Sequence, residues 1–308
     1  MTGRLTWDDL PPALRRRLEE LLGDPVARTR SCMGGFSPSS AEILTASSGR
    51  ELFVKAVRGR DNTGSLRLNR DEAAVLAALP ATSPAPSLVD SFTDGEWFVL
   101  VTEVAPGSLP DQPWTSEQLD RVLEALDRLQ ARATPSPVGG LRSVTDSLGP
   151  DMRGFDRVAA DPPEELDPWL RGHLDELRAA ARRGIDALDG DTLCHADVRS
   201  DNLLLTGDGA VALVDWAWAS RGSRIADALQ LLSSVEDPEG ALGVNARVDA
   251  VLDAHRLPHQ VGTDVLAGVL GFFVDAARRP HDPSLPLLGV HRRARRDSLL
   301  PLVRARWE

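Results

Sequence analysis

The chain lacks several features that would assign it to a class at once. It has two cysteines, Cys32 and Cys194, among 308 residues, so we expect no disulfide framework and a reduced, cytoplasmic location. Its first residues lack the apolar segment of a signal peptide, and no run approaches 18 consecutive apolar residues, so we expect no membrane partner. The pattern G-x-x-x-x-G-K-[ST] does not occur either, which excludes a P-loop enzyme.

Lysine is the scarcest charged residue. Lys55 is the single lysine, and the other 34 of the 35 basic residues are arginine. Such a lone lysine is either chance or a place where a compact point charge is needed. The net charge of -11 argues against nucleic acid as a partner. An acidic surface attracts cationic small molecules, although a general role in solubility explains the charge at least as well.

What is present is an ordinary globular composition. Hydrophobic residues make up 42% of the chain, and 308 residues suffice for one large or two medium domains with proper cores. No internal repeat or low-complexity segment stands out.

The stretch from Cys194 to Asp215 concentrates the chemistry. Asp197 follows His195 by two residues, and Asn202 follows Asp197 by five. Two apolar runs with a Thr-Gly-Asp-Gly turn between them predict a hairpin that brings Asn202 and Asp215 together. Their oxygens are hard ligands that suit Mg²⁺ together with phosphate oxygens. The alternative is a solvated acidic loop.

Two earlier segments give Lys55 a context. Residues 51–57 predict an apolar strand in which a charge is unexpected unless it is paired. A strong helix follows over residues 69–79 and ends at Pro80. We expect Glu72, in the first turn of this helix, to pair with Lys55, with Asp71 as the fallback partner. The alternative for Glu72 is an interaction with the helix dipole.

Residues 31–48 contain a turn rich in glycine and serine, followed by a strand. Backbone N–H groups of such a turn can bind phosphates, but an ordinary hairpin explains the same residues. Two further strands, over 91–93 and 97–102, are joined by Asp94-Gly95, a hairpin signal.

The remainder of the chain is predicted to be mainly helical. A Thr115–Gln118 capping box begins one of these helices. The acidic segment 151–167 is better explained as a solvated loop than as a recognition site for a cationic substrate, and the basic run 291–296 as a solvated helix face. The predicted helices span 6–23, 114–133, 170–188, 246–255, 263–278 and 287–306.

These motifs in this order resemble the aminoglycoside phosphotransferase family and its relatives such as the choline kinases. The resemblance is most specific in His195-Ala-Asp197 and Val214-Asp215-Trp216. It implies an α+β, two-lobed protein-kinase-like fold: a small N-terminal antiparallel sheet lobe with a helix, and a larger, mainly helical C-terminal lobe. It also implies a nucleotide-binding lobe over residues 1–103 and a catalytic and substrate-binding lobe over 104–308.

The resemblance further implies an ATP- or GTP-dependent phosphotransferase that acts on a hydroxyl of a small molecule, such as a cationic antibiotic. Asp197 would take or orient the hydroxyl proton. Asn202 and Asp215 would hold Mg²⁺, and Lys55 with its partner Glu72 would position the nucleotide phosphates.

Other residues of the nucleotide site follow from the same resemblance. Gly34, Gly35 and Ser37 would form the phosphate turn, and the backbone near Glu103 and Ala105 would be the hinge that holds the purine base.

Two residues would support the catalytic loop rather than react. His195 would brace it, since no serine-nucleophile motif accompanies the His-Asp pair. Asp227, which opens a helix, would brace the same loop. A plain N-cap or first-turn role is the alternative for Asp227.

The sequence departs from the kinase pattern at the degenerate phosphate turn, and glycine is absent after Asp215-Trp216. No activation segment is evident, which argues against a protein kinase. The alternatives are a kinase of a metabolite amino alcohol or sugar, a non-catalytic nucleotide-binding scaffold, and a metal-dependent hydrolase. The joint presence of Lys55, Asp197, Asn202 and Asp215 argues against the scaffold, and a hydrolase would not need the lysine strand or the hinge.

Overall fold

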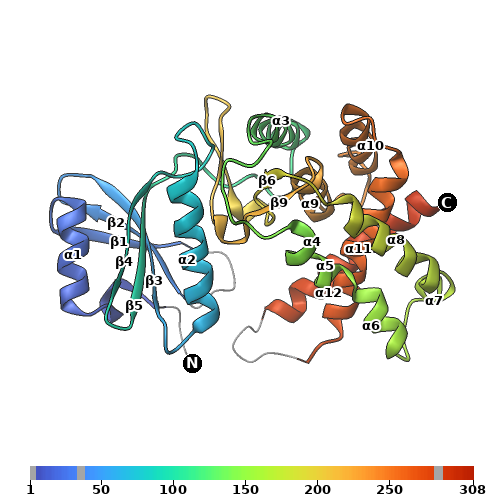
Figure 1. The fold of residues 1–308 in the computed structure, drawn as a ribbon, viewed down its shortest axis with the longest axis horizontal. Helices are drawn as coiled ribbons and strands as arrows, with labels where there is room; N and C mark the ends of the chain where they lie inside the picture. The colour runs from blue at the N-terminus through green and yellow to red at the C-terminus, as the bar shows by residue number, and fades with distance from the viewer. Residues whose placement is uncertain (1–4, 33–38, 281–286) are drawn as a thin grey trace. The chain divides into compact units, whose positions relative to one another are not determined.

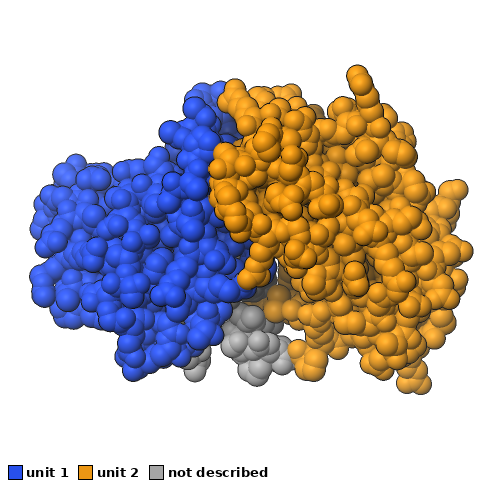
Figure 2. Space-filling model, viewed as in Figure 1, with its two compact units in different colours: residues 1–109, 200–218 blue, residues 110–199, 219–308 orange. Residues whose placement is uncertain are grey.

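The computed structural model describes residues 5–32, 39–280 and 287–308, and the chain falls into two compact units (Figure 2). Unit 1 comprises residues 1–109 and 200–218, and unit 2 comprises residues 110–199 and 219–308. Residues 200–218 therefore group by contact with the first third of the chain. This grouping by contact does not test the lobe boundary expected at residue 103, which stays a prediction.

Unit 1 contains a five-stranded antiparallel sheet with the order β1-β2-β3-β5-β4 (Figure 1). Gly95, at φ 57°, closes the predicted Asp94-Gly95 turn between β4 and β5. The sequence did not indicate β1. The strands are β1 (Val26–Ser31), β2 (Ser40–Ala46), β3 (Glu51–Arg58), β4 (Leu88–Asp94) and β5 (Trp97–Glu103).

The two faces of this sheet carry different helices (Figure 1). Helix α1 (Pro12–Leu22) packs leucines such as Leu14 and Leu18 against Leu52, Val54 and Ala56 of β3. Side chains alternate along a strand, so Lys55 points to the opposite face. Helix α2 (Thr63–Ala78) lies on that face. The strand alternation thus directs the lone lysine toward α2.

Helices α1 and α2 differ from their predicted bounds. The helix expected over 6–23 begins only at Pro12, because Pro11 and Pro12 separate it from a short 3₁₀ turn, Trp7–Asp9. Its predicted end is confirmed: Gly23 adopts the left-handed conformation, φ 84°, that glycine tolerates best. Helix α2 starts at Thr63 rather than residue 69, because Asn62 caps it through Ser65 N–H. Glu72 is therefore in the middle of the helix and not in its first turn.

The predicted hairpin completes unit 1. Strands β7 (Leu203–Leu205) and β8 (Val211–Leu213) pair antiparallel, with Gly209 at φ 92° in the turn. The 3₁₀ turns Ser200–Asn202 and Trp216–Trp218, labelled η2 and η3 in chain order, flank the hairpin. Helix α2 contacts the second of these turns, so the hairpin is anchored beside the lysine face of the sheet.

Unit 2 is mainly helical, and helix α11 (His259–Ala277) contacts α5, α6, α8, α9, α10 and α12. One two-stranded sheet, β6 (Thr192–Cys194) with β9 (Ser220–Gly222), carries the residues that precede His195. The remaining helices are α3 (Ser116–Arg132), α4 (Val144–Ser147), α5 (Gly149–Met152), α6 (Gly154–Ala160), α7 (Pro168–Gly172), α8 (Leu174–Ala187), α9 (Ala226–Ser234), α10 (Val244–Ala254) and α12 (Leu288–Trp307).

Helix α11 is long and apolar enough to cross a membrane by length and composition alone. Within the described residues it is the one helix that meets this test, and 67% of the relevant window is buried inside the protein. Burial among neighbouring helices is the ordinary reason for such a composition. Helix α11 is therefore the core helix of unit 2.

Several predictions for unit 2 were too coarse. The segment 151–167, expected to be a solvated loop, contains the end of α5 and the whole of α6. The helix expected over 170–188 is two helices, α7 and α8. Thr115 caps α3 through Gln118 N–H, but the Gln118 side chain bonds Asp111 instead of completing the predicted box. In the basic run 291–296, Arg295 is buried, contrary to the expected solvated face.

Candidate functional site

Lys55 lies at the centre of a charged cluster in unit 1. Its Nζ donates to Glu72 Oε2 at 2.6 Å and to Asp215 Oδ1 at 2.9 Å. Glu72 is the partner that the sequence favoured over Asp71. The side chains of Lys55 and Glu72 are 12% and 4% exposed, whereas that of Asp215 is 37% exposed. Lys55 and Glu72 thus form the buried part of the cluster, and the Asp215 carboxylate is open to solvent.

Burial and charge act against each other in this cluster. Desolvation by itself would lower the pKa of Lys55, but the carboxylates of Glu72 and Asp215 outweigh it and raise that pKa above its ordinary value. Burial raises the pKa of Glu72, while the ammonium of Lys55 opposes this shift. The backbone N–H of Trp216 also donates to Glu72. Lys55 is therefore a fixed cation, held by an acid on each side.

Asp215 is held in an unusual backbone conformation. Its φ of 65° lies in the left-handed region, which costs a residue with a side chain on the order of 1–3 kcal/mol. Such strain persists only where the surroundings impose it, and here Lys55 holds the carboxylate while η3 follows directly. The conformation turns the Asp215 side chain out of the hairpin and toward the lysine face.

The hairpin brings Asn202 to the same place, as its pairing predicted. Val214 N–H donates to Asn202 O at 3.0 Å, and Leu203 pairs with Leu213. Within the described residues, no group of three or more His, Cys, Asp or Glu side chains forms a metal site. One carboxylate and one amide oxygen are nevertheless a donor set that suits Mg²⁺, which usually takes its other ligands from water and phosphate.

The segment after β5 is fixed to the hairpin. Ser108 and Leu205 exchange both backbone hydrogen bonds, at 3.1 and 2.8 Å. Gly107 has φ 112°, and a Cβ at this position would lie 2.8 Å from Leu205 O, so only glycine allows the close approach. Glu103 ends β5, its N–H donating to Ser87 O, and Ala105 follows in irregular backbone. The predicted hinge residues therefore lie on a segment bonded to the β7–β8 hairpin.

In unit 2, the predicted catalytic loop follows β6 directly. Asp197 is partly exposed, and its Oδ1 lies 3.7 Å from Arg199 Nε. His195 is fully buried, and its Nδ1 accepts from Asp197 N–H at 3.3 Å. An accepting Nδ1 leaves the ring proton on Nε2. Ala196, at φ 59°, forms the bend between them. His195 thus contacts the backbone of Asp197 in the manner of a brace.

The loop is also bonded to helix α9. Both oxygens of the buried Asp227 accept backbone N–H groups, from His195 at 2.8 Å and from Ala196 at 2.9 Å. Burial raises the pKa of Asp227 to about 6, and these two hydrogen bonds oppose the shift. Asp227 does not cap its own helix. Gln230, one turn later on α9, also bonds the loop, and sequence reasoning missed it although the spacing of three places it on the face of Asp227.

Three predicted site residues cannot be placed. Gly34, Gly35 and Ser37 lie outside the described residues, so the phosphate turn stays a prediction. The described residues around them, Cys32 and Ser39, adjoin β1 and β2.

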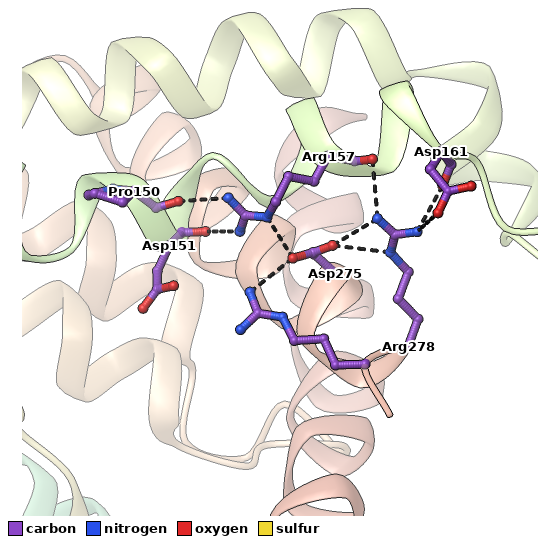
Figure 3. Close-up of polar contacts among 7 residues, drawn as sticks. Pro150, Asp151, Arg157, Asp161, Asp275 and Arg278 are labelled. Carbon is purple, nitrogen blue, oxygen red and sulfur yellow. Dashed lines mark hydrogen bonds and ion pairs between the residues drawn. The ribbon is translucent and has the colours of Figure 1, made fainter. Parts of the chain in front are cut away.

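Two of the six acidic side chains in the segment 151–167, Asp156 and Asp161, form ion pairs within unit 2. Asp156 accepts from Arg178 and Arg182 at 3.0 and 2.8 Å. Asp161 pairs with Arg278, which also binds the buried Asp275 of α11 (Figure 3). Asp275 accepts from Arg157 of α6 at 2.7 Å as well. These contacts fasten α6 to α11 and leave fewer free carboxylates for a cationic substrate than the composition suggests.

Comparisons with known proteins identify the family and the fold. The profile of a phosphotransferase enzyme family matches residues 29–261. No curated protein sequence matches the chain. A solved aminoglycoside phosphotransferase from Alicyclobacillus acidocaldarius is 19% identical, with 96% of each chain covered and a TM-score of 0.56. An aminoglycoside-3'-phosphotransferase of type VIII is 24% identical, with 86% of this chain and 98% of that one covered and a TM-score of 0.54.

A choline kinase from Streptococcus pneumoniae is 15% identical, with coverages of 94% and 98% and a TM-score of 0.57. At these identities the solved structures establish the fold, which is the α+β, protein-kinase-like fold that the sequence predicted. The family match spans well over half of the chain. The protein therefore belongs to this phosphotransferase enzyme family and has the fold of its small-molecule kinases.

Proposed function

We propose that the protein transfers the γ-phosphate of ATP or GTP to a hydroxyl group of a small molecule, with Mg²⁺ as the metal. The observation that carries this proposal is the double contact of Lys55 with Glu72 and Asp215. A buried point charge beside a solvent-open carboxylate suits the binding of a metal–triphosphate. The ammonium can interact with the phosphate oxygens, and the carboxylate can interact with the metal. A hydrolase built on the carboxylates alone would not need the lysine.

In this proposal unit 1 binds the nucleotide. Asn202 and Asp215 hold the magnesium, which neutralises charge on the phosphates when bound. Lys55 positions phosphate oxygens, and Glu72 keeps Lys55 in place. The phosphate turn Gly34, Gly35 and Ser37 and the backbone of Glu103 and Ala105 contribute the remaining nucleotide contacts, since the latter segment is bonded to the β7–β8 hairpin that carries Asn202 and Asp215 at its ends.

Asp197 handles the acceptor. The acceptor oxygen forms a bond to the γ-phosphorus as the bond to the β–γ bridging oxygen breaks, and the hydroxyl proton passes to the Asp197 carboxylate. His195 and Asp227 contribute by holding the loop and do not exchange this proton. Catalysis by these groups consists of positioning and charge neutralisation.

The acceptor class follows from charge more than from shape. The net charge of -11 favours a cationic, hydroxylated molecule such as an aminoglycoside or an amino alcohol. The solved relatives named above carry out their reactions on acceptors of this kind, according to their names. A cytoplasmic location and a role in antibiotic resistance would accompany an antibiotic acceptor.

One screen tests the proposal. Release of nucleoside diphosphate from Mg-ATP and Mg-GTP is measured across aminoglycosides, other hydroxylated antibiotics, amino alcohols and sugars, with Asp197→Asn as the control enzyme. We expect release that depends on one acceptor class and disappears in the variant. Tight nucleotide binding with no acceptor-dependent release by the wild-type protein would instead favour a nucleotide-binding scaffold.

A further inference from the structure

Side chains accept a hydrogen bond from each backbone N–H of the loop around Asp197, residues 195–198. The four consecutive N–H groups from His195 to Val198 all donate to side-chain atoms. Asp227 accepts the first two, His195 Nδ1 accepts the third, and Gln230 Oε1 accepts the fourth at 2.8 Å. The loop therefore has no regular secondary structure to define its shape, and its shape depends on these side chains.

Gln230 makes a second bond to the same loop. Its Nε2 donates to Ala196 O at 2.9 Å. The two bonds of this one amide thus bind the residues immediately before and after Asp197. A primary amide is suited to this because it carries a donor and an acceptor on one planar group. Neither a carboxylate nor an aliphatic side chain can make both contacts.

The position of Gln230 is fixed from its own helix. Asp227 and Gln230 are three residues apart on α9, so both side chains leave the same face of the helix. Ser233 Oγ donates to Gln230 O at 2.7 Å one turn further on. The two residues on one rigid helix face therefore supply three of the four acceptors.

The conformation of Ala196 shows what these bonds maintain. Its φ of 59° is unfavourable for alanine, and such backbone persists where surrounding contacts over-determine it. Asp227 holds Ala196 by its N–H, and Gln230 holds it by its carbonyl. The bend at Ala196 sets the direction in which the following residue, Asp197, presents its carboxylate.

We propose that Gln230 is a positioning residue for phosphoryl transfer: its amide clamps Ala196 O and Val198 N–H and so fixes the orientation of the Asp197 carboxylate. This inference rests on the proposed catalytic role of Asp197. Gln230 itself touches neither substrate nor nucleotide in this role, so its effect should be on turnover rather than on nucleotide binding.

The experiment compares three variants with the wild type, using Mg-ATP and the acceptor that the screen identifies. Gln230→Met keeps the length of the side chain and removes both hydrogen bonds. Gln230→Glu keeps an acceptor for Val198 N–H but replaces the donor to Ala196 O with a second acceptor. Leu231→Ala removes fully buried apolar contacts from the same helix and leaves the side chains that bond the loop in place, so it controls for loss of stability.

We expect kcat to fall by about 10- to 100-fold in Gln230→Met, the scale expected when a catalytic group is misplaced by roughly 1 Å. The KM for Mg-ATP should stay within about twofold, since the nucleotide contacts are elsewhere. In Gln230→Glu, kcat should fall by at least as much, because a carboxylate oxygen then faces the carbonyl oxygen of Ala196. Leu231→Ala should lower the melting temperature more than Gln230→Met does. Assayed well below its melting temperature, Leu231→Ala should have the kcat of the wild type.

Amide hydrogen exchange provides a readout that does not depend on turnover. In Gln230→Met, exchange at Val198 should accelerate, because its N–H loses the Gln230 acceptor, while exchange in α11 should not change. Wild-type kcat or wild-type exchange at the Val198 amide in Gln230→Met would overturn the proposal, as would an equal loss of kcat in Leu231→Ala. The parallel Asp197→Asn enzyme separates the two claims: full turnover in that variant contradicts the proposed function itself, whatever Gln230 does.

Discussion

The lysine cluster and the Asp197 loop are held in place by different kinds of contact. In the cluster, charged side chains from a strand, a helix and a hairpin bond directly to one another. In the loop, the backbone carries the contacts, and its N–H groups end on a carboxylate, an imidazole and an amide. The cluster can bind a charged ligand that replaces or shares its ion pairs. The loop instead holds one side chain, that of Asp197, in a fixed orientation. Removing groups from each region should therefore give different losses.

The largest loss should follow Asp215→Ala. This substitution removes the one solvent-open carboxylate of the cluster and half of the expected metal donors, so Mg²⁺-dependent turnover should fall below detection. Asn202→Ala is the matched variant and should retain measurable turnover, because a neutral ligand contributes less charge. Both are measured as phosphoryl transfer against Mg²⁺ concentration. Wild-type metal dependence in both would show that the hairpin ends do not hold the metal.

A substitution of Asp197 in the loop should lower turnover without lowering stability. Asp197→Asn keeps the shape of the side chain but cannot take the hydroxyl proton, so kcat should fall by roughly 10²- to 10⁴-fold. Because the N–H groups of the loop still end on the same acceptors, thermal stability should change little. A matching drop in melting temperature would instead assign Asp197 to the structure of the loop.

An intermediate effect is expected for Glu72→Gln. The buried Lys55 would keep Asp215 but lose its shorter charge-assisted bond, which costs about 1.5–3 kcal/mol of folding free energy. The KM for Mg-ATP should rise as well, since Lys55 gains freedom. Urea denaturation and steady-state kinetics measure the two effects. Glu96→Gln, which removes an exposed partner of Arg58 and Arg60, should leave both quantities close to wild type.

The last effect concerns the dependence of stability on pH and leaves turnover aside. The pKa of Asp227 is about 6 in the folded protein and near 4 in an unfolded chain. Between these values the folded state binds the extra proton, so the contribution of Asp227 to stability must fall as pH rises. The stability advantage of wild type over Asp227→Asn should shrink by up to about 1.4 kcal/mol per pH unit from about pH 4 to 6, and then stay level.

Asp275 supplies the contrasting control in the same unit. Burial would raise its pKa, but the three arginines around it lower the pKa overall. Its contribution is therefore complete above about pH 4 and is lost as pH falls further. Denaturation of Asp275→Asn should show this opposite sign. An Asp227 advantage that grew with pH would mean that its two backbone bonds outweigh its burial.

Sequence reasoning succeeded where one residue type has a single physical use. Gly23 ends α1, Asp94-Gly95 forms a turn, and Lys55 in an apolar strand needed an acidic partner, which proved to be Glu72. It failed where neighbours override local preference. Helix α2 begins at Thr63, six residues before its predicted start, because Asn62 caps it. Gly64 and Ser65 are therefore helical, although neither residue favours a helix.

The contacts of the Asp197 loop were the least visible in the sequence. Gln230 is an unremarkable residue on an apolar helix until α9 is placed beside the loop. Arg295 appeared to belong to a solvated basic run, yet it donates to the carbonyl groups of Ser233 and Ser234 at the end of α9. Both depend on long-range packing, which periodicity along a single segment does not report.

The central claim is that nucleotide phosphates bind at Lys55 and that Asp197 serves only the acceptor. Calorimetric titration of Mg-ATP into wild type, Lys55→Arg and Asp197→Asn tests it most directly. We expect equal affinity in wild type and Asp197→Asn. We expect affinity to be at least about tenfold weaker in Lys55→Arg, because a planar guanidinium does not reproduce a point charge held between two acids. Wild-type affinity in Lys55→Arg, or joint loss of binding and stability in Asp197→Asn, would contradict the claim.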